Sequence, residues 1–250
     1  MSEFNSLFIL FGVGLIAGFI NVNAGGGSSL TLPALIFLGL DSALANGTNR
    51  VALLIQNIAA VQSFKKENYH QFGISFKLAL FTLPGAIAGA ILAVNIDDLL
   101  FKKILAVVMI GIVFSMLFHK KRSGNENNTK GIITWIGYLS MFGIGFYGGF
   151  LQVGVGFLLM TSLNYLMKFD LIVTNMHKVF IILIYTIPAL IIFAVTNNVN
   201  WLFGISLGIG NALGGWWGVK LSVKKGERFI RFVLIAAILI MAVKLMDVFK

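Results

Sequence analysis

The chain has 250 residues, of which 58% are hydrophobic and only 11% are charged, and its mean hydropathy is +0.93. A water-soluble domain of this size cannot bury so much apolar surface, so the composition excludes a soluble globular protein and predicts an all-α, polytopic membrane protein. The absence of cysteine excludes disulfides, thiolate metal sites and cysteine nucleophiles, and 19 basic against 9 acidic residues give a net charge of +10.

Apolar segments follow one another at approximately 7–40, 44–64, 73–95, 99–118, 132–167, 171–195, 201–219 and 229–249. The most polar interruption, 119–130, is predicted to be a cytoplasmic linker between a first transmembrane repeat, 1–118, and a second, 131–250. A single crossing takes about 20 residues, so 7–40 and 132–167 are each too long for one helix. Both contain glycines, and both are predicted to be broken helices.

The two predicted breaks occupy related positions. The first runs from Asn21 to Ser29 and the second from Gly149 to Gly156. Laying Gly18 on Gly149 also aligns several further pairs, which indicates a weak internal duplication. The pairs are Asn21 with Gln152, Gly25 with Gly156, Arg50 with Lys178, Gly85 with Gly214 and Gly89 with Gly218.

The Lys and Arg residues distinguish two topologies, because cytoplasmic loops carry the excess of positive charge. If each long segment crosses once, the basic residues show no bias between the two sides. If each enters and returns, as two spans or as a re-entrant hairpin, the loops 65–77, 119–130, 168–178 and 220–231 are all cytoplasmic and hold 14 of the 19 basic residues. This second topology gives about five membrane elements per half. An odd number inverts one repeat relative to the other, and both chain termini are predicted to lie outside.

Inverted repeats with broken helices are typical of secondary transporters. Glycines let the backbone leave helical geometry, and the helix that starts after a break offers unpaired N–H groups and a positive dipole end, which favour anions. Such a break must also be buried or line a wet cavity. A glycine kink that only aids packing is the simpler interpretation of one break, but it explains two breaks at duplicated positions less well.

The charged residues favour an anion as substrate. All nine acidic residues lie in predicted loops or at segment ends, so no carboxylate is offered at mid-membrane for a cation or a proton relay. Arg50 and Lys178 instead adjoin apolar runs at corresponding places in the two repeats. We expect them to approach the site from opposite faces and to neutralise an oxyanion, Arg50 through its bidentate fork. A lysine that extends its ammonium group to the membrane interface is the alternative for Lys178.

The predicted substrate-binding residues come from both breaks and from the two cationic positions: Asn21, Asn23, Gly25, Gly26, Gly27, Ser28, Asn49, Arg50, Gln152, Gly154, Gly156 and Lys178. His177 is a candidate for proton coupling because histidine titrates near neutral pH, although an interfacial histidine without that role is also common. Gln56, Asn57 and Tyr185 either line a cavity or bond between helices. No catalytic residue, metal site or cofactor is expected.

Three motifs in the first half strongly resemble the first repeat of the sulfite exporter TauE/SafE family, also called the toluene-sulfonate uptake permease family. They are Gly18 to Gly27, Thr31 to Leu35 and Ala45 to Arg50. Residues 145–150, 154–156 and 177–179 are similar to the second repeat. The resemblance implies a multi-pass carrier of the bacterial inner membrane for small sulfur-containing anions such as sulfite or organosulfonates. The sequence departs from the family pattern at Asn21, where members often carry an acidic residue.

The expected function is therefore a secondary transporter, acting as an exporter by alternating access, with a small anion and the lipid bilayer as its partners and no nucleic acid. An anion channel, or a carrier for a different small anion such as a carboxylate, is the alternative. An intramembrane enzyme built on Ser28 or Ser29 with His177 is disfavoured, since the sequence has no HExxH pattern and no paired carboxylates.

Overall fold

The computed structural model describes residues 3–117 and 131–248, so the predicted linker at 119–130 lies outside the described residues. The first half forms α1 (Glu3–Ala24), α2 (Ser28–Phe37), α3 (Ser42–Lys66), α4 (Phe72–Asn95) and α5 (Asp98–Leu117). The second half forms α6 (Trp135–Phe150), α7 (Val155–Thr161), the π-helical turn η1 (Ser162–Leu166), α8 (Leu171–Val195) and α9 (Trp201–Val248). The described part of the chain has no strand, and the predicted all-α class is confirmed there.

The outer helices present apolar side chains to the surroundings. Among the described residues, α1, α4 and α8 are long and apolar enough to cross a membrane. Large exposed hydrophobic side chains include Phe4, Phe8 and Ile16 on α1, Ile87 and Ile91 on α4, and Ile205 and Ile209 on α9. A soluble monomer rarely exposes so much apolar surface, so this surface suits contact with lipid chains.

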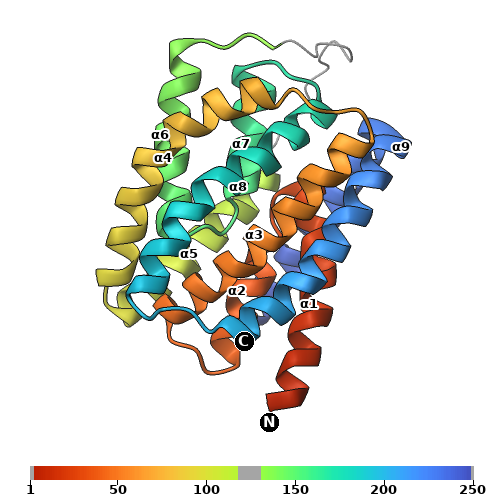
Figure 1. Ribbon diagram of the computed structural model, residues 1–250. Coiled ribbons are helices and arrows are strands. Elements are labelled where there is room, and N and C mark those ends of the chain that lie inside the picture. Colours follow the sequence, from red (N-terminus) through yellow and green to blue (C-terminus); the bar gives the residue numbers. More distant parts are fainter. Residues whose placement is uncertain (1–2, 118–130, 249–250) are drawn as a thin grey trace.

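The interior is formed by α3 and α8, which run through the middle of the bundle with α1 and α9 on one side and α4 and α6 on the other (Figure 1). Helix α3 is buried although it is polar: Asn46, Asn49, Arg50, Gln56 and Asn57 are at most 1% exposed. Lipid cannot solvate these groups, and the surrounding helices shield α3 from it. The polar residues that could form a site are therefore held at the centre of the molecule.

Glycines allow two pairs of outer helices to pack backbone to backbone. On α1, a Cβ atom added to Gly14 would lie 2.4 Å from the carbonyl oxygen of Leu207 on α9, and one on Gly18 would lie 2.2 Å from that of Asn211. A side chain at either position would overlap the neighbouring helix. These spaced glycines therefore permit the two helices to pack closely.

The α4–α6 pair repeats the same contacts. A Cβ on Gly145 would lie 2.2 Å from the oxygen of Thr82, and one on Gly149 would lie 2.0 Å from that of Ala86. Gly145 and Gly149 on α6 therefore make the same backbone contacts with α4 as Gly14 and Gly18 on α1 make with α9. The contacts match Gly85 and Gly89 to Gly210 and Gly214, one helical turn earlier than the sequence alignment placed them.

The last two predicted segments, 201–219 and 229–249, are not separated. Helix α9 continues through the predicted loop at 220–231 and has 48 residues, about twice what one crossing needs. The predicted loop contains Lys, Leu, Val, Glu and Arg, which sustain a helix, with no proline and one glycine, Gly226. The loop was predicted from its charge, but charged residues alone do not end a helix, so α9 continues where a loop was predicted.

Candidate functional site

Both long segments are interrupted at their predicted glycine-rich positions. Helix α1 ends at Ala24, and Gly25 follows with φ of +77°. Helix α6 ends at Phe150, and two residues of the second break, Gln152 and Gly154, have φ of +66° and +74°. Glycine adopts this left-handed conformation at little cost, whereas Gln152 is strained there. Residues strained in this way cluster at functional sites.

The two breaks touch each other. A Cβ atom added to Gly156 would lie 2.5 Å from the Cα of Gly25, and one added to Gly25 would lie 2.2 Å from the carbonyl carbon of Gly156. Two residues that the sequence aligned with each other are thus in backbone contact. The predicted residues of the first break, Gly26, Gly27 and Ser28, are all buried beside this contact.

Arg50 on α3 binds the end of α6, in the other half of the chain. Its guanidinium group donates to the carbonyl oxygens of Gly148, at 3.3 Å, and Gly149. Asn46, one turn earlier on α3, donates to the oxygen of Phe150 at 2.8 Å. The ring of Phe193 lies 4.6 Å from the Arg50 guanidinium carbon. These groups satisfy three of the carbonyls that a helix end leaves without intrahelical partners.

Lys178 on α8 performs the same task at the end of α1. Its ammonium group donates to the carbonyl oxygens of Val22 at 2.6 Å and Asn21 at 3.1 Å, and to the side-chain oxygen of Asn175 at 2.8 Å. Arg50 and Lys178 are both 0% exposed. Lys178 does not extend to the interface, so the alternative interpretation of this residue is wrong.

The two cations are crossed between the halves. Each stands on a central helix of one half and binds the broken helix of the other. A helix C-terminus carries the negative end of the helix dipole, so a cation is favoured there electrostatically as well as through its hydrogen bonds. The sequence predicted that these cations bind an oxyanion. It did not predict that they donate to backbone carbonyls, as they do in the structure.

The neighbouring polar residues join the same centre. The side chain of Asn21 donates to Gln56 on α3 at 3.2 Å. The hydroxyl of Thr31 on α2 donates to Asn49 on α3 at 2.7 Å. The helices on both sides of the first break, α1 and α2, are thus bonded to α3. The structure therefore brings Asn21 and Asn49 together with the first break.

Asn23 is turned toward α9 instead of α3. Its side-chain nitrogen donates to the oxygen of Phe19 at 2.9 Å, and its side-chain oxygen accepts a hydrogen bond from Ser222. These contacts secure the end of α1 to α9.

His177 does not join the breaks. Its Nδ1 lies 2.7 Å from the hydroxyl of Ser75 on α4, and its ring packs on Phe169 with centroids 4.5 Å apart. Ser29 donates to the oxygen of Gly26, at 2.7 Å. The pairing of Ser28 or Ser29 with His177, on which an enzyme was weighed, therefore finds no support in the contacts.

Several buried polar atoms at this centre have no hydrogen-bond partner among the described residues. They include the side-chain nitrogens Nδ2 of Asn49, Nε of Arg50 and Nδ2 of Asn175, both amide atoms of Gln152 and the hydroxyl of Tyr185. Most are donors, and unpartnered buried donors are the groups with which a protein binds an anion. Asn46 and Asn175 were not predicted as site residues, although each lies one helical turn before a predicted cation.

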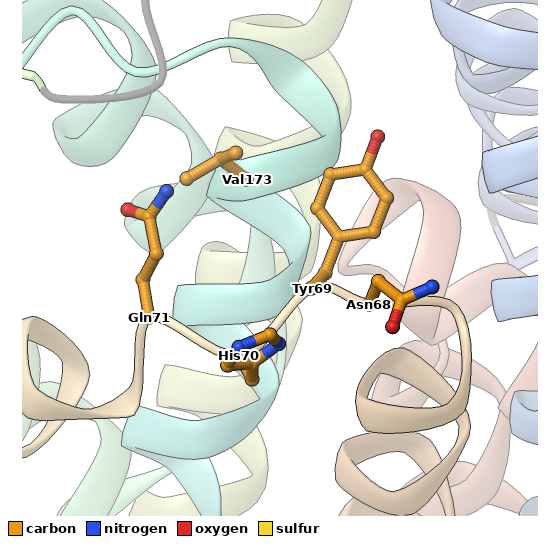
Figure 2. Close-up of a pocket in the computed structure, with 5 residues that line it drawn as sticks. All are labelled: Asn68, Tyr69, His70, Gln71 and Val173. Atoms are coloured by element: carbon orange, nitrogen blue, oxygen red, sulfur yellow. The ribbon is translucent and has the colours of Figure 1, made fainter.

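A separate cavity of about 350 Å³ lies at the turn between α3 and α4. Figure 2 shows the four side chains of the turn and Val173 of α8, which line it: Asn68, Tyr69, His70, Gln71 and Val173. None of the predicted site residues lines this cavity. It is distinct from the crossed cations.

Comparison with known proteins shows which family the chain resembles in sequence. The profile of the sulfite exporter TauE/SafE family matches residues 10–245. The chain belongs to this family. It is therefore a membrane transporter, and the resemblance in the two sets of motifs is confirmed.

Curated relatives agree with this assignment. A probable membrane transporter protein of Haemophilus influenzae is 27% identical over 96% of this chain and 94% of its own length. The probable membrane transporter protein ORF9 of a Sinorhizobium species is 28% identical over 97% of this chain and 93% of its own. YfcA of Escherichia coli K12, also named a probable membrane transporter protein, is 27% identical over 98% and 94%. No solved structure matches the chain significantly.

Proposed function

We propose that this TauE/SafE transporter is a secondary carrier that exports a small sulfur-containing oxyanion, such as sulfite or an organosulfonate, across the bacterial inner membrane. The observation that supports this most is the pair of crossed cations, Arg50 and Lys178, at the place where the two breaks meet. No cofactor and no chemical step are needed for this function.

The electrostatics of the centre favour an anion. Arg50 and Lys178 are buried without a carboxylate: the buried polar residues of the described chain include no Asp or Glu. Uncompensated charge in a low-dielectric interior is costly, and carbonyl oxygens offset it only in part. An oxyanion would neutralise these charges and accept from the unpartnered nitrogens of Asn49 and Gln152.

The packing of the centre favours a carrier over a channel. Gly25 and Gly156 are in backbone contact, and in this proposal an anion passes only when the two breaks move apart. Alternating access through inverted repeats would supply that movement, and the repeated glycine contacts of α1–α9 and α4–α6 support such a duplication of 1–118 and 131–250. In this scheme both termini lie outside, and the first break, with Gly26, Gly27 and Ser28, forms one half of the substrate site.

The test is transport in proteoliposomes that contain the purified protein. Uptake of labelled sulfite and of labelled methanesulfonate is measured, with and without a pH gradient, for the wild type and for Arg50→Gln. Lys102→Gln is the matched control, since Lys102 is an exposed cation paired with Asp98 at 2.6 Å. We expect saturable uptake that Arg50→Gln abolishes and Lys102→Gln preserves.

Counterflow separates the alternatives. A carrier exchanges labelled for unlabelled anion without net current, whereas a channel passes current and shows no counterflow. Movement of a small carboxylate in place of both sulfur compounds would refute the sulfur-anion assignment and leave an anion carrier. Failure of the folded wild type to move any of these anions would refute the proposed function.

A further inference from the structure

Tyr185 is a buried tyrosine whose hydroxyl group lacks a partner. It lies on α8, seven residues after Lys178, and is 0% exposed. Its hydroxyl has no hydrogen-bond partner among the described residues. A buried hydroxyl loses its bonds to water, and a native protein normally replaces them. Phenylalanine would fill the same space without this cost, so the hydroxyl requires an explanation.

The hydroxyl of Tyr185 lies at the end of α6, where Arg50 also binds. A Cβ atom added to Gly148 would be 2.9 Å from the Tyr185 oxygen, and Arg50 donates to the carbonyl oxygen of that same Gly148 at 3.3 Å. The Nε of Arg50 is also without a partner among the described residues. Two donors from different central helices therefore converge on one residue of the broken helix.

A neighbouring tyrosine shows what a structural hydroxyl does here. Tyr147, on α6 itself, donates its hydroxyl to the carbonyl oxygen of Val153 and so braces the second break. Tyr185 makes no such bond. Its counterpart in the first half, Asn57, lies seven residues after Arg50 and donates to Leu53 of its own helix at 2.7 Å. Tyr185 is thus the member of this pair whose donor stays available.

We infer that Tyr185 is a substrate-binding residue whose hydroxyl donates to the oxyanion that Arg50 binds. This inference rests on the proposed function. It adds Tyr185 to the proposed site and makes the donors at the two helix ends different. The end of α6 offers a guanidinium and a phenol, whereas the end of α1 offers the ammonium of Lys178 and the unpartnered amide nitrogen of Asn175. The two ends therefore hold the same anion with different donors. We therefore expect the phenol of Tyr185, the uncharged donor at the end of α6, to contribute to the choice among anions.

The test is anion binding to purified Tyr185→Phe, measured by isothermal titration calorimetry with sodium sulfite and sodium methanesulfonate. Loss of a hydrogen bond to a charged group predicts affinity weaker by about 10- to 100-fold. The thermal unfolding midpoint without anion should be no lower than that of the wild type, because the hydroxyl has no partner to lose among the described residues. Tyr138→Phe is the control, since Tyr138 packs on Phe81 with ring centroids 4.4 Å apart, away from the breaks.

The double variant with Arg50→Lys tests whether both residues touch one anion. Shared contact predicts a combined loss smaller than the product of the two single losses. Wild-type affinity in Tyr185→Phe would overturn this inference alone, and so would loss of folding without anion, which would make the hydroxyl structural. Failure of the wild type to bind either anion would overturn the proposed function with it.

Discussion

Gly25 and Gly156 meet backbone to backbone, one from each half of the chain, and no side chain fits between them. Arg50 of α3 holds the end of α6, and Lys178 of α8 holds the end of α1. A movement that parts the two breaks would separate the two glycines. A substitution at this pair therefore tests directly whether the two breaks are in contact.

Gly156→Ala should destabilise the closed centre. The added Cβ would lie 2.5 Å from the Cα of Gly25, and backbone cannot yield as a flexible side chain can. Overpacking of this kind costs about 1–3 kcal/mol. We expect a lower thermal unfolding midpoint in detergent and a loss of transport. Gly143→Ala is the control, since a Cβ there would meet nothing within 4 Å; equal midpoints for both variants would contradict the contact.

Arg50→Gln should destabilise the protein even without substrate. It removes the donors to Gly148 and Gly149, and a buried carbonyl without a partner costs about 1–3 kcal/mol. Arg50→Lys should restore part of the stability, because Lys178 shows that an ammonium group can bind a helix end in this protein. The measurement is thermal unfolding of the purified variants. Arg50→Gln and Arg50→Lys of equal stability would mean that charge at this position does not hold α6.

His177 should affect coupling rather than binding. Its ring is tied to Ser75 and not to either break, so His177→Gln is expected to retain anion exchange. If this histidine carries the coupled proton, accumulation driven by a pH gradient should fall while counterflow persists. Both rates are measured in the same proteoliposomes. An equal fall in both would refute a coupling role.

The inverted topology predicts that the N-terminus lies outside and that the linker at 119–130 lies in the cytoplasm. The absence of native cysteine allows single cysteines to be labelled without background. A cysteine at Ser2 should react with a membrane-impermeant maleimide added to intact cells. A cysteine at Asn125, in the predicted cytoplasmic linker, should react only after the cells are lysed. The reverse pattern would invert the assignment, and labelling of both in intact cells would exclude it.

The polar centre was within reach of the sequence because amides and cations are rare in membrane helices and because they, like the two glycine runs, fall at duplicated positions. Both breaks lie where the glycine runs predict. The partners of Arg50 and Lys178 were not predictable, since backbone carbonyls leave no sign in a sequence. The free hydroxyl of Tyr185 was equally hidden, because only three-dimensional contacts distinguish it from the bonded hydroxyl of Tyr147.

The differences in register and in element count have separate physical origins. Glycines repeat every four residues along α9, so an alignment can slip by a turn and still pair Gly with Gly; the contacts of Gly85 and Gly89 with α6 decide between the alternatives. The continuity of α9 through 220–231 depends on helix propensity, which charge counting ignores. Hydropathy and charge locate the apolar segments in the sequence, whereas three-dimensional contacts show which helices pack together and in which register.

The pairing of α1 with α9 also governs how the chain is made. Helix α1 is synthesised before α9, but the carbonyls against which Gly14 and Gly18 pack belong to Leu207 and Asn211 of α9. Helix α1 therefore stays in the bilayer with its small-residue face against lipid until α9 has been made. A nascent chain that stops before α9 lacks the partner of α1, and the backbone groups beside Gly14 and Gly18 then stay without their packing contact.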